Sequence, residues 1–336
     1  MKSKKVVTVF GAGSWGTAIA KVLAENQYHV NLWIREEKVF TSIKKTRKNK
    51  LFLPGIELPK RINPIISLED KRLFDTNYLV FSLPAQYTRN FLMQIKNNIK
   101  RGVLIINTSK GIEENSMKTI YEVFNDSVPY TKSRYVTISG PSFAKDVANR
   151  LPTAISMASY NPDSLIKAKN LFHNKYFAVY PSNDVVGLEI GGSMKNIIAI
   201  GAGIFDGLEF SESSKATFIT RGLNEIRILA ELMGAKKTTF LGLAGIGDLV
   251  LTAYGNKSRN RNLGFMLGKG KKLKKIINSG PTIAEGYFTT KAVYRLIKKF
   301  RIRLPILETI YAILYKNKNP KILLEILTRK DATIDI

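Results

Sequence analysis

Two isolated charges in apolar surroundings are the first residues of this chain that could do chemistry. Lys195 lies in the apolar segment 186–205, where Glu189 is the only other charged side chain. An ammonium in such surroundings must reach solvent, find a partner or have its pKa lowered by burial. A lysine shifted towards neutrality can act as a general acid or base. The alternative is a lysine on the solvent-exposed face of a helix, which composition alone favours.

Asp248 is the only charge in the segment 240–252. A buried carboxylate is costly unless it is paired, so we expect a cationic partner, for which Lys195 is one candidate. The alternative is a helix cap in a glycine-rich loop.

A third group of polar side chains suits a phosphate. Ser258, Arg259 and Asn260 precede a helical stretch, and they combine a hydroxyl, a planar guanidinium and an amide next to helix-start amides. An ordinary basic loop is an equally good interpretation of these three residues alone.

These residues need elements that position them, and the clearest such element is a glycine-rich turn near the start of the chain. An apolar strand at 6–10 runs into Gly11, Gly13 and Gly16, and an amphipathic helix follows at 17–25. Gly11 permits a tight turn, Gly13 lets the backbone approach a pyrophosphate, and Gly16 lets the helix pack closely on the strand. The pattern predicts a dinucleotide site; a strand-turn-helix corner without a ligand is the alternative.

Arg35 follows the second predicted strand, at the place where NAD-binding proteins usually carry an acidic residue. A guanidinium can hold the 2′-phosphate of NADP through paired hydrogen bonds. The neighbouring Glu36 and Glu37 leave NAD open, and an exposed surface arginine is the alternative.

The remaining apolar patterns predict an α/β protein with two domains. Near-continuous apolar runs at 29–34, 77–83, 103–108 and 134–139 are typical of parallel strands that are buried on both faces. Helical spacing dominates at 194–204, 216–233, 289–300 and 307–315. We therefore expect an N-terminal Rossmann-type doubly wound sheet over 1–187, followed by an all-α C-terminal domain over 188–336.

Composition narrows the classes of function. The chain has 336 residues, no cysteine, and 53 Lys plus Arg against 26 Asp plus Glu, which gives a net charge of +27. Without cysteine there are no disulfides or thiolate ligands, and we expect no metal. The basic residues are spread along the chain with no nucleic-acid motif, so we expect no specific nucleic-acid partner. No apolar run reaches the roughly 18 residues of a membrane helix, and no signal peptide precedes the first strand. We expect a cytoplasmic protein.

Nine segments in order resemble the bacterial NAD(P)-dependent glycerol-3-phosphate dehydrogenases. They are GAGSWGTA (11–18), NTSKGIE (107–113), ISGPSFAKDVA (138–148), LPTAIS (151–156), IGGSMKNIIAIGAGIFDG (190–207), ITRGLNEI (219–226), GLAGIGDLVLT (242–252), NKSRNRNLG (256–264) and AEGYFTT (284–290).

The resemblance implies a reversible hydride transfer between NADPH or NADH and dihydroxyacetone phosphate, which yields sn-glycerol 3-phosphate for phospholipid synthesis. It also implies a C-terminal domain like that of 6-phosphogluconate dehydrogenase, and a homodimer. The proton would pass through Lys195, helped by Lys110 and Asp248. The residues implied to bind the cofactor, besides the three glycines, are Ser14, Trp15, Arg35, Lys110, Ala144, Arg259, Ile283 and Glu285. Those implied to bind the substrate are Lys110, Gly140, Ser142, Lys195, Asp248, Ser258, Arg259 and Asn260; Ser142 stands where many relatives carry threonine.

Two other functions remain open from the residues. One is a related two-domain reductase that acts on another hydroxy or keto acid. The other is a nucleotide-sensing protein that binds without turnover.

Overall fold

The computed structural model describes residues 5–277 and 284–327, and the chain divides into two compact units. Within the described residues, the first unit comprises the chain up to Ser109 together with Ile120–Val185. The second comprises Lys110–Thr119 and the chain from Val186 onward. The division along the chain thus falls between Val185 and Val186, and ten residues that follow a strand of the first unit belong to the second.

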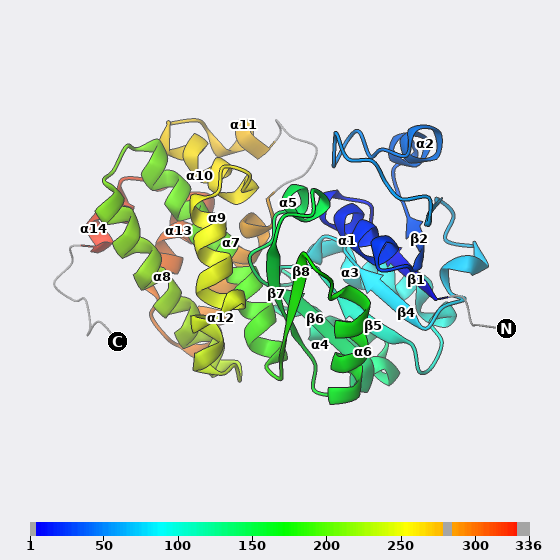
Figure 1. Cartoon of the computed structure of the whole chain (residues 1–336). Coiled ribbons are helices and arrows are strands. Elements are labelled where there is room, and N and C mark those ends of the chain that lie inside the picture. Colours follow the sequence, from blue (N-terminus) through cyan, green and yellow to red (C-terminus); the bar gives the residue numbers. More distant parts are fainter. Residues whose placement is uncertain (1–4, 278–283, 328–336) are drawn as a thin grey trace. The chain divides into compact units, whose positions relative to one another are not determined.

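One sheet of eight strands forms the centre of the first unit, in the order β3-β2-β1-β4-β5-β6-β7-β8 (Figure 1). Strands β1 to β6 pair in parallel, β7 is antiparallel to β6, and β8 is parallel to β7. The order 3-2-1-4-5-6 is that of the Rossmann fold, so the predicted doubly wound sheet is confirmed.

The strands are β1 (Val6–Phe10), β2 (His29–Trp33), β3 (Ile62–Ile65), β4 (Tyr78–Phe81), β5 (Leu104–Asn107), β6 (Tyr135–Ser139), β7 (Thr153–Ala158) and β8 (Phe177–Ser182). The helices of this unit are α1 (Ser14–Glu25), α2 (Glu37–Thr46), η1 (Lys71–Leu73), α3 (Ala85–Ile95), η2 (Lys96–Asn98), α4 (Ile120–Ser127), η3 (Pro129–Arg134), α5 (Ala144–Ala148) and α6 (Pro162–Phe172). The sequence predicted β1, β2, β4, β5 and β6 but not β3, β7 or β8.

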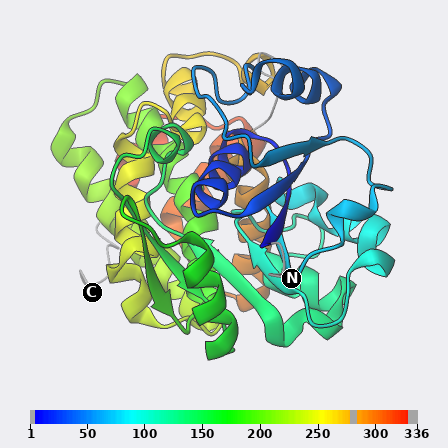
Figure 2. The same cartoon turned by 45° about the vertical axis from the view of Figure 1, so that its right-hand side comes forward.

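Alternate residues of the central strands pack on opposite faces of the sheet, as the pleat requires. Val9 of β1 joins an aliphatic core that includes Ile19 of α1. Its neighbour Phe10 joins an aromatic cluster instead, with its ring centroid 5.1 Å from that of Phe81 and 5.2 Å from that of Phe91 of α3. Because both faces are covered, these strands are apolar along most of their length. Figure 2 shows α1, in blue, beside its strand.

The second unit is helical. Its elements are α7 (Val185–Gly207), α8 (Glu212–Leu232), η4 (Lys237–Leu241), the π-helical turn η5 (Leu243–Gly247), α9 (Asp248–Tyr254), α10 (Arg259–Gly268), α11 (Leu273–Ile277), α12 (Glu285–Phe300), α13 (Pro305–Lys316) and α14 (Ile322–Leu327). The four predicted helical segments lie within or largely within α7, α8, α12 and α13. The predicted helical C-terminal part is therefore confirmed.

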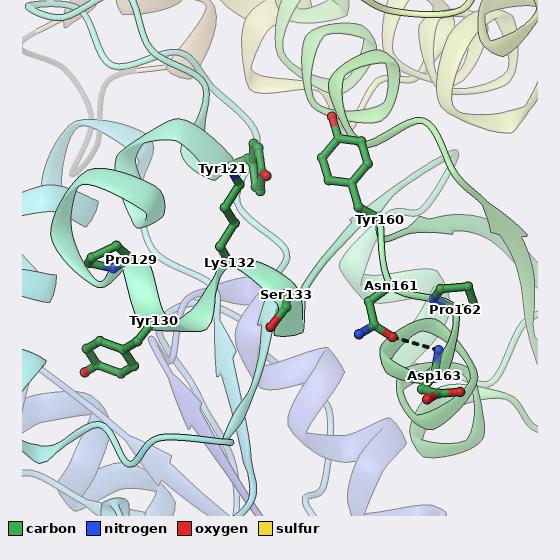
Figure 3. A pocket seen from close by; sticks show the side chains of 9 residues that line it. All are labelled: Tyr121, Pro129, Tyr130, Lys132, Ser133, Tyr160, Asn161, Pro162 and Asp163. Carbon is green, nitrogen blue, oxygen red and sulfur yellow. Dashed lines mark hydrogen bonds between the residues drawn. The ribbon is translucent and has the colours of Figure 1, made fainter.

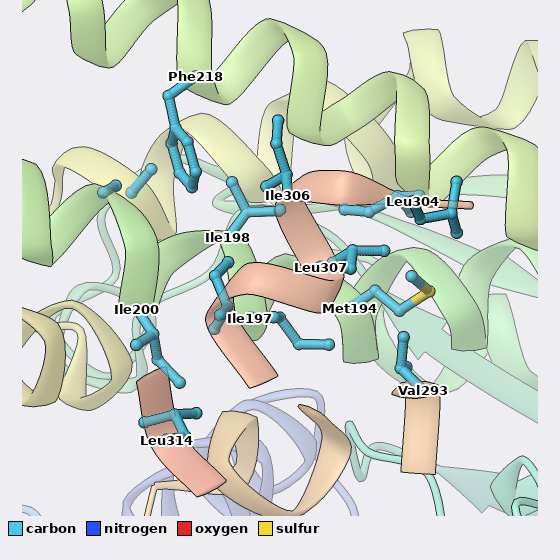
Figure 4. Packing of buried hydrophobic residues seen from close by; sticks show 14 of the residues in the cluster. Met194, Ile197, Ile198, Ile200, Phe218, Val293, Leu304, Ile306, Leu307 and Leu314 are labelled. Carbon is cyan, nitrogen blue, oxygen red and sulfur yellow. The ribbon is translucent and has the colours of Figure 1, made fainter. Parts of the chain in front are cut away.

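Helix α7 forms the middle of the second unit's core. Figure 4 shows Ile197 and Ile198 of α7 among side chains of the surrounding helices, including Phe218 of α8 and Leu307 of α13. Over 18 residues its mean hydropathy is 1.2, so by length and composition α7 could cross a membrane. The expectation that no segment is apolar enough was therefore too strict. However, 94% of this window is buried inside the structure, as is typical of a core helix.

Helix α10 packs unusually close to α7. A Cβ atom on Gly203 would lie 1.9 Å from the carbonyl oxygen of Arg261, and one on Gly264 would lie 1.8 Å from that of Ile200. Only glycine permits this approach at either position. The start of α10, which carries Arg259, is thereby held beside the helix that carries Lys195.

Candidate functional site

In the first unit, the glycine-rich turn has the geometry that the sequence predicts. Gly11 has a φ of +107°, and a Cβ on it would lie 2.4 Å from the carbonyl oxygen of Ser82. A Cβ on Gly16 would lie 1.9 Å from the carbonyl oxygen of Gly11, so close packing requires glycine there too. Gly13 is different: a Cβ there would meet nothing within 4 Å, and no side chain caps the helix at this position. Space is thus open beside Gly13, and no side chain caps the start of α1, a combination that suits an anion.

A buried asparagine that sequence reasoning missed supports this turn. Asn49 is fully buried, and its amide donates to the carbonyl oxygen of Ala12 at 2.8 Å and to the hydroxyl of Thr17 at 2.9 Å. The hydroxyl of Ser14 donates to the carbonyl oxygen of Phe52 at 2.5 Å. Both contacts come from the connection after α2. Nothing in the basic run around Asn49 singles it out in the sequence.

The other predicted residues of the first unit follow the carboxyl ends of parallel strands. Arg35 lies just beyond β2, Gly140 follows β6 directly, and Ala144 is the first residue of α5. The hydroxyl of Ser142 donates to the carbonyl oxygen of Gly140 at 3.2 Å. In an open parallel sheet, ligands bind outside these strand ends. Trp15 packs partly buried against the aliphatic core.

Arg35 is exposed and forms an ion pair with its neighbour. Its Nε and Nη2 atoms donate to Oε1 of Glu36 at 3.0 and 2.6 Å, and 66% of the side chain is exposed. A guanidinium has five N–H donors, so others remain for a phosphate.

In the second unit, the two isolated charges meet. Nζ of Lys195, on α7, donates to Oδ1 of Asp248, the first residue of α9, and this pairing confirms one of the alternatives left open by the sequence. The close approach depends on Gly191, one turn before Lys195, because a Cβ there would lie 2.6 Å from the carbonyl oxygen of Ala244. Lys195 is 8% exposed, so it does not lie on a solvent-exposed helix face.

Lys110 completes what we call the Asp248 cluster, composed of Asp248, Lys195 and Lys110. Nζ of Lys110 donates to Oδ2 of Asp248 at 2.7 Å, so the two lysines occupy different oxygens of one carboxylate. The sequence places Lys110 directly after a strand, and we expected the sheet to present it. Instead it belongs to the second unit, together with the other two members of the cluster.

The environment of Lys195 favours its neutral form. Burial lowers its pKa from 10.5 to about 7, and the positive charge of Lys110 acts in the same direction, whereas Asp248 opposes both. Nζ also donates to the hydroxyl of Thr252 at 2.8 Å. An amine with a pKa near neutrality can both give and take a proton at physiological pH. Thr252 was not predicted.

Of the three residues predicted to bind a phosphate, Ser258 and Asn260 form hydrogen bonds within and between helices. Ser258 caps α10 by accepting from the backbone amide of Arg261 at 3.2 Å, and Arg259 is exposed at the first position of that helix. The amide of Asn260 donates to Oδ1 of Asn196 at 2.9 Å and accepts from the backbone amide of Gly286 at 2.9 Å. This side chain ties the starts of α10 and α12 to the residue after Lys195.

Of the two remaining predicted cofactor residues, Glu285 is the first residue of α12. Ile283 lies outside the described residues.

A cavity of about 710 Å³ in the first unit contains none of the predicted residues. Figure 3 shows its lining, which includes Tyr121, Tyr130, Tyr160 and Lys132. The α6 start beside it is already capped, since Oδ1 of Asn161 accepts from the backbone amide of Asp163.

A Rossmann-type sheet with an open glycine turn, together with a helical unit that holds a buried lysine of lowered pKa, is typical of two-domain NAD(P)-dependent dehydrogenases. Comparison with known families makes this class specific. The model of the NAD-dependent glycerol-3-phosphate dehydrogenase N-terminus matches residues 6–165, and that of the C-terminus matches residues 184–325. The chain belongs to the NAD-dependent glycerol-3-phosphate dehydrogenase family, and the predicted family is confirmed.

Individual relatives are similar over nearly their whole length. The glycerol-3-phosphate dehydrogenase (NAD(P)+) of Carboxydothermus hydrogenoformans is 41% identical over 94% of this chain and 94% of its own. That of Geobacter metallireducens is 42% identical over 96% of this chain and 97% of its own. Among solved structures, the glycerol-3-phosphate dehydrogenase of Coxiella burnetii has a TM-score of 0.92 at 34% identity, covering 97% of this chain and 99% of its own.

Proposed function

We propose that this protein is a glycerol-3-phosphate dehydrogenase, which transfers hydride reversibly between NADPH or NADH and dihydroxyacetone phosphate to give sn-glycerol 3-phosphate. The observation that carries the proposal is the Asp248 cluster, in a chain that matches the family over both its halves. The cluster supplies a titratable amine, which reduction of a ketone requires.

Lys195 is the general acid and base of the proposed reaction. The nicotinamide, when bound, supplies the hydride that reduces C2 of the substrate. Lys195 then donates its proton to the alkoxide that forms at C2, and in the reverse direction it takes the proton from the hydroxyl. Asp248 holds the amine in place, and Lys110 keeps its pKa low. A positioned acid of this kind typically contributes about 10²- to 10⁴-fold to the rate.

The residues present fit a dinucleotide. The open space at Gly13 and the uncapped amides of α1 suit the pyrophosphate, and Arg35 has spare donors for a 2′-phosphate. We assign cofactor binding to Gly11, Gly13, Ser14, Trp15, Gly16, Arg35, Lys110, Ala144, Arg259, Ile283 and Glu285.

The substrate would be held by side chains that suit a phosphate and a ketone. We assign this role to Lys110, Gly140, Ser142, Lys195, Asp248, Ser258, Arg259 and Asn260. Arg259 and Asn260 would grip the phosphate, and that remote binding energy would orient the carbonyl.

The family also supports four finer inferences. The product would feed phospholipid synthesis, the enzyme would act in the cytoplasm, and it would form a homodimer. We further assign residues 1–187 to cofactor binding and 188–336 to the substrate and catalysis.

One assay tests the reaction. Dihydroxyacetone phosphate is mixed with the protein and either NADH or NADPH, and the loss of absorbance of the reduced nucleotide is followed. Turnover of a non-phosphorylated keto acid but not of dihydroxyacetone phosphate would point to a different reductase. Nucleotide binding with no turnover of any phosphorylated ketone would point to a sensor.

Arg35→Ala tests the cofactor assignment. We expect NADPH-dependent turnover to fall more than NADH-dependent turnover, because only NADPH carries the additional phosphate. Equal losses with both nucleotides would show that Arg35 does not contact this phosphate.

A further inference from the structure

We propose that Lys291 and Arg295 of α12 are positioning residues, which hold the segment 110–119 against the second unit and thereby keep Lys110 on Asp248. The proposal deepens the proposed function and rests on it for the role of Lys110. It starts from a feature of the chain's course: the segment follows β5 and precedes α4, both in the first unit, yet its contacts are with the second.

The segment 110–119 is a closed turn in which Ile112, Glu113 and Thr119 are buried. Ile112 is fully buried in the core of the second unit and forms an isolated antiparallel bridge with Thr119. The backbone amide of Glu113 donates to the carbonyl oxygen of Lys118, and that of Met117 donates to the carbonyl oxygen of Glu113, each at 2.9 Å. These bonds link the two ends of the segment, so we expect it to move as a unit.

Two cations from one face of α12 hold this segment at its tip. Nζ of Lys291 lies 2.7 Å from Oε1 of Glu114, and Nη1 of Arg295 donates to the carbonyl oxygen of Glu114 at 3.1 Å. The two cations are four residues apart, and so lie on the same side of the helix. The ammonium of Lys291 is also 6.0 Å from the ring centroid of Tyr315. Helix α12 thus binds both the side chain and the backbone of Glu114.

Neither the Lys291 contact nor the Arg295 contact would hold the segment 110–119 in place alone. The Lys291 side chain is 43% exposed, and an exposed ion pair contributes little because water screens it. The arginine contact is a charge-assisted hydrogen bond to a backbone carbonyl, which is stronger. We therefore test the pair by removing both cations at once.

Movement of the segment would change the proton affinity of Lys195. The neighbouring charges with the largest effect on Lys195 are Asp248 of α9 and Lys110 of the segment, and Nζ of Lys195 also donates to the hydroxyl of Thr252. If Lys110 moves away, Lys195 loses a positive neighbour and keeps the carboxylate. Its ammonium form then becomes more stable, and its pKa rises.

The first experiment is the pH dependence of glycerol 3-phosphate oxidation by the full-length double variant Lys291→Ala/Arg295→Ala. We expect the midpoint of the rise in kcat to move up by about half to one pH unit, and kcat at pH 7 to fall about two- to sixfold, with the KM for the nucleotide changed less than about twofold. An unchanged midpoint would overturn the proposal.

The matched control is Lys298→Ala/Lys299→Ala, which removes two positive charges from the same helix. These side chains are exposed and lie over the rings of Tyr294 and Phe300 rather than against the described segment 110–119, so we expect the midpoint to stay in place. An equal shift in the control would mean that charge at a distance, rather than positioning, explains the effect.

Glu114→Ala distinguishes positioning of the segment from charge acting at a distance, because the two predict opposite shifts in the pKa of Lys195. Loss of a negative charge acting through space would lower the pKa of Lys195, whereas release of the segment would raise it. We expect an upward shift; an unchanged or lower midpoint would contradict the proposal. In a Lys110→Met background, the double variant should add no further shift, because the group that it positions is already gone.

A measurement without substrate distinguishes failure of this proposal from failure of the proposed function. Hydrogen exchange of the backbone amides of Glu113 and Met117 should become about tenfold faster in the Lys291→Ala/Arg295→Ala variant and remain unchanged in the control. Faster exchange in a protein that does not turn over dihydroxyacetone phosphate would remove the proposed function and leave the anchoring intact. Unchanged exchange would remove the anchoring.

Discussion

Two carboxylates of the second unit each hold two cations, but only one of these clusters is suited to proton transfer. Asp248 contacts two lysines, whereas Asp206 contacts Lys215 at 2.6 Å and Arg261 at 2.7 Å. The two lysines are similarly buried, since the side chain of Lys215 is 5% exposed and that of Lys195 is 10% exposed, but the carboxylate of Asp248 is 1% exposed and that of Asp206 is 14% exposed. The partners of the two carboxylates differ as well.

At Asp206 one of the two partners is an arginine, and Nε of Arg261 donates to Oδ2 of the carboxylate at 2.7 Å. The ammonium of Lys215 lies 4.2 Å from the ring centroid of Tyr254, and the face of an aromatic ring favours a cation. At Asp248 the second cation is another amine, Lys110, and burial together with this positive charge lowers the pKa of Lys195 to about 7. An arrangement of one carboxylate with two cations is therefore structural or reactive according to what surrounds the cations.

The largest effect should come from replacing Lys195, compared with the same replacement of Lys215. Lys195→Met should lower kcat by about 10²- to 10⁴-fold while the nucleotide still binds, because the proton donor is gone. Lys215→Met should change kcat less than about threefold, since that lysine has no part in the reaction. Absorbance of NADPH measures both, and nucleotide fluorescence measures binding. Retention of more than about a tenth of the rate by Lys195→Met would exclude it as the proton donor.

Removal of the Asp206 carboxylate should mainly lower the stability of the protein. Asp206→Asn leaves two nearly buried cations without a counter-charge, so the free energy of unfolding should fall by about 2–3 kcal/mol, with some relief because Arg261 retains contact with water. Urea unfolding measures this loss. The pH profile of kcat should be unchanged, and a moved midpoint would show that the two clusters are coupled.

The pH dependence should follow the Asp248 cluster alone. Oxidation of glycerol 3-phosphate needs neutral Lys195 and should rise with pH through about 7, whereas reduction needs the ammonium and should fall over the same range. Lys110→Met should raise this midpoint by about one unit, because a positive neighbour is lost. Arg261→Met should not move it. Initial rates between pH 5.5 and about 9 distinguish these cases.

The smallest effect should come from Arg261→Lys, which tests whether two lysine partners are sufficient to make a carboxylate cluster reactive. Arg261→Lys gives Asp206 two lysine partners, as Asp248 has, but loses the additional bond from Nη1 to Oδ1 of Asn256 at 2.8 Å. The free energy of unfolding should fall by about 1 kcal/mol, and kcat should keep its value and its pH profile. A new ionisation in the kcat profile would show that two lysine partners are sufficient to make a carboxylate cluster reactive.

The strands that could be predicted are those covered on both faces. β1, β4 and β5 lie in the middle of the sheet, where burial on both faces makes most residues apolar, with Thr8 and Asn107 as buried polar exceptions. β3 and β8 lie at the two edges, and both contain a proline and partly exposed residues, so the apolar signal is interrupted. β7, next to one edge, is also only partly buried.

For the site, the sequence could predict the pairing of Lys195 with Asp248, because each is a lone charge among apolar residues. It could not show that Lys110 belongs to the second unit, since only the folded contacts of the segment 110–119 decide this. Thr252 could have been found, because it lies one helical turn after Asp248 and so on the same face of α9. The buried contacts of Asn49 leave no such periodic signal.

The place of Lys195 within α7 has a consequence for the synthesis of the chain. Until the ribosome has made the helices from α8 onward, nothing later in the chain can cover the apolar surface of α7. A helix of this length and hydropathy then resembles a substrate for the membrane-insertion machinery. Lys195 stands in its middle, where a charged side chain adds roughly 2.5–3.5 kcal/mol to the cost of insertion. The amine proposed to serve the reaction thus also disfavours capture of the nascent helix by a bilayer.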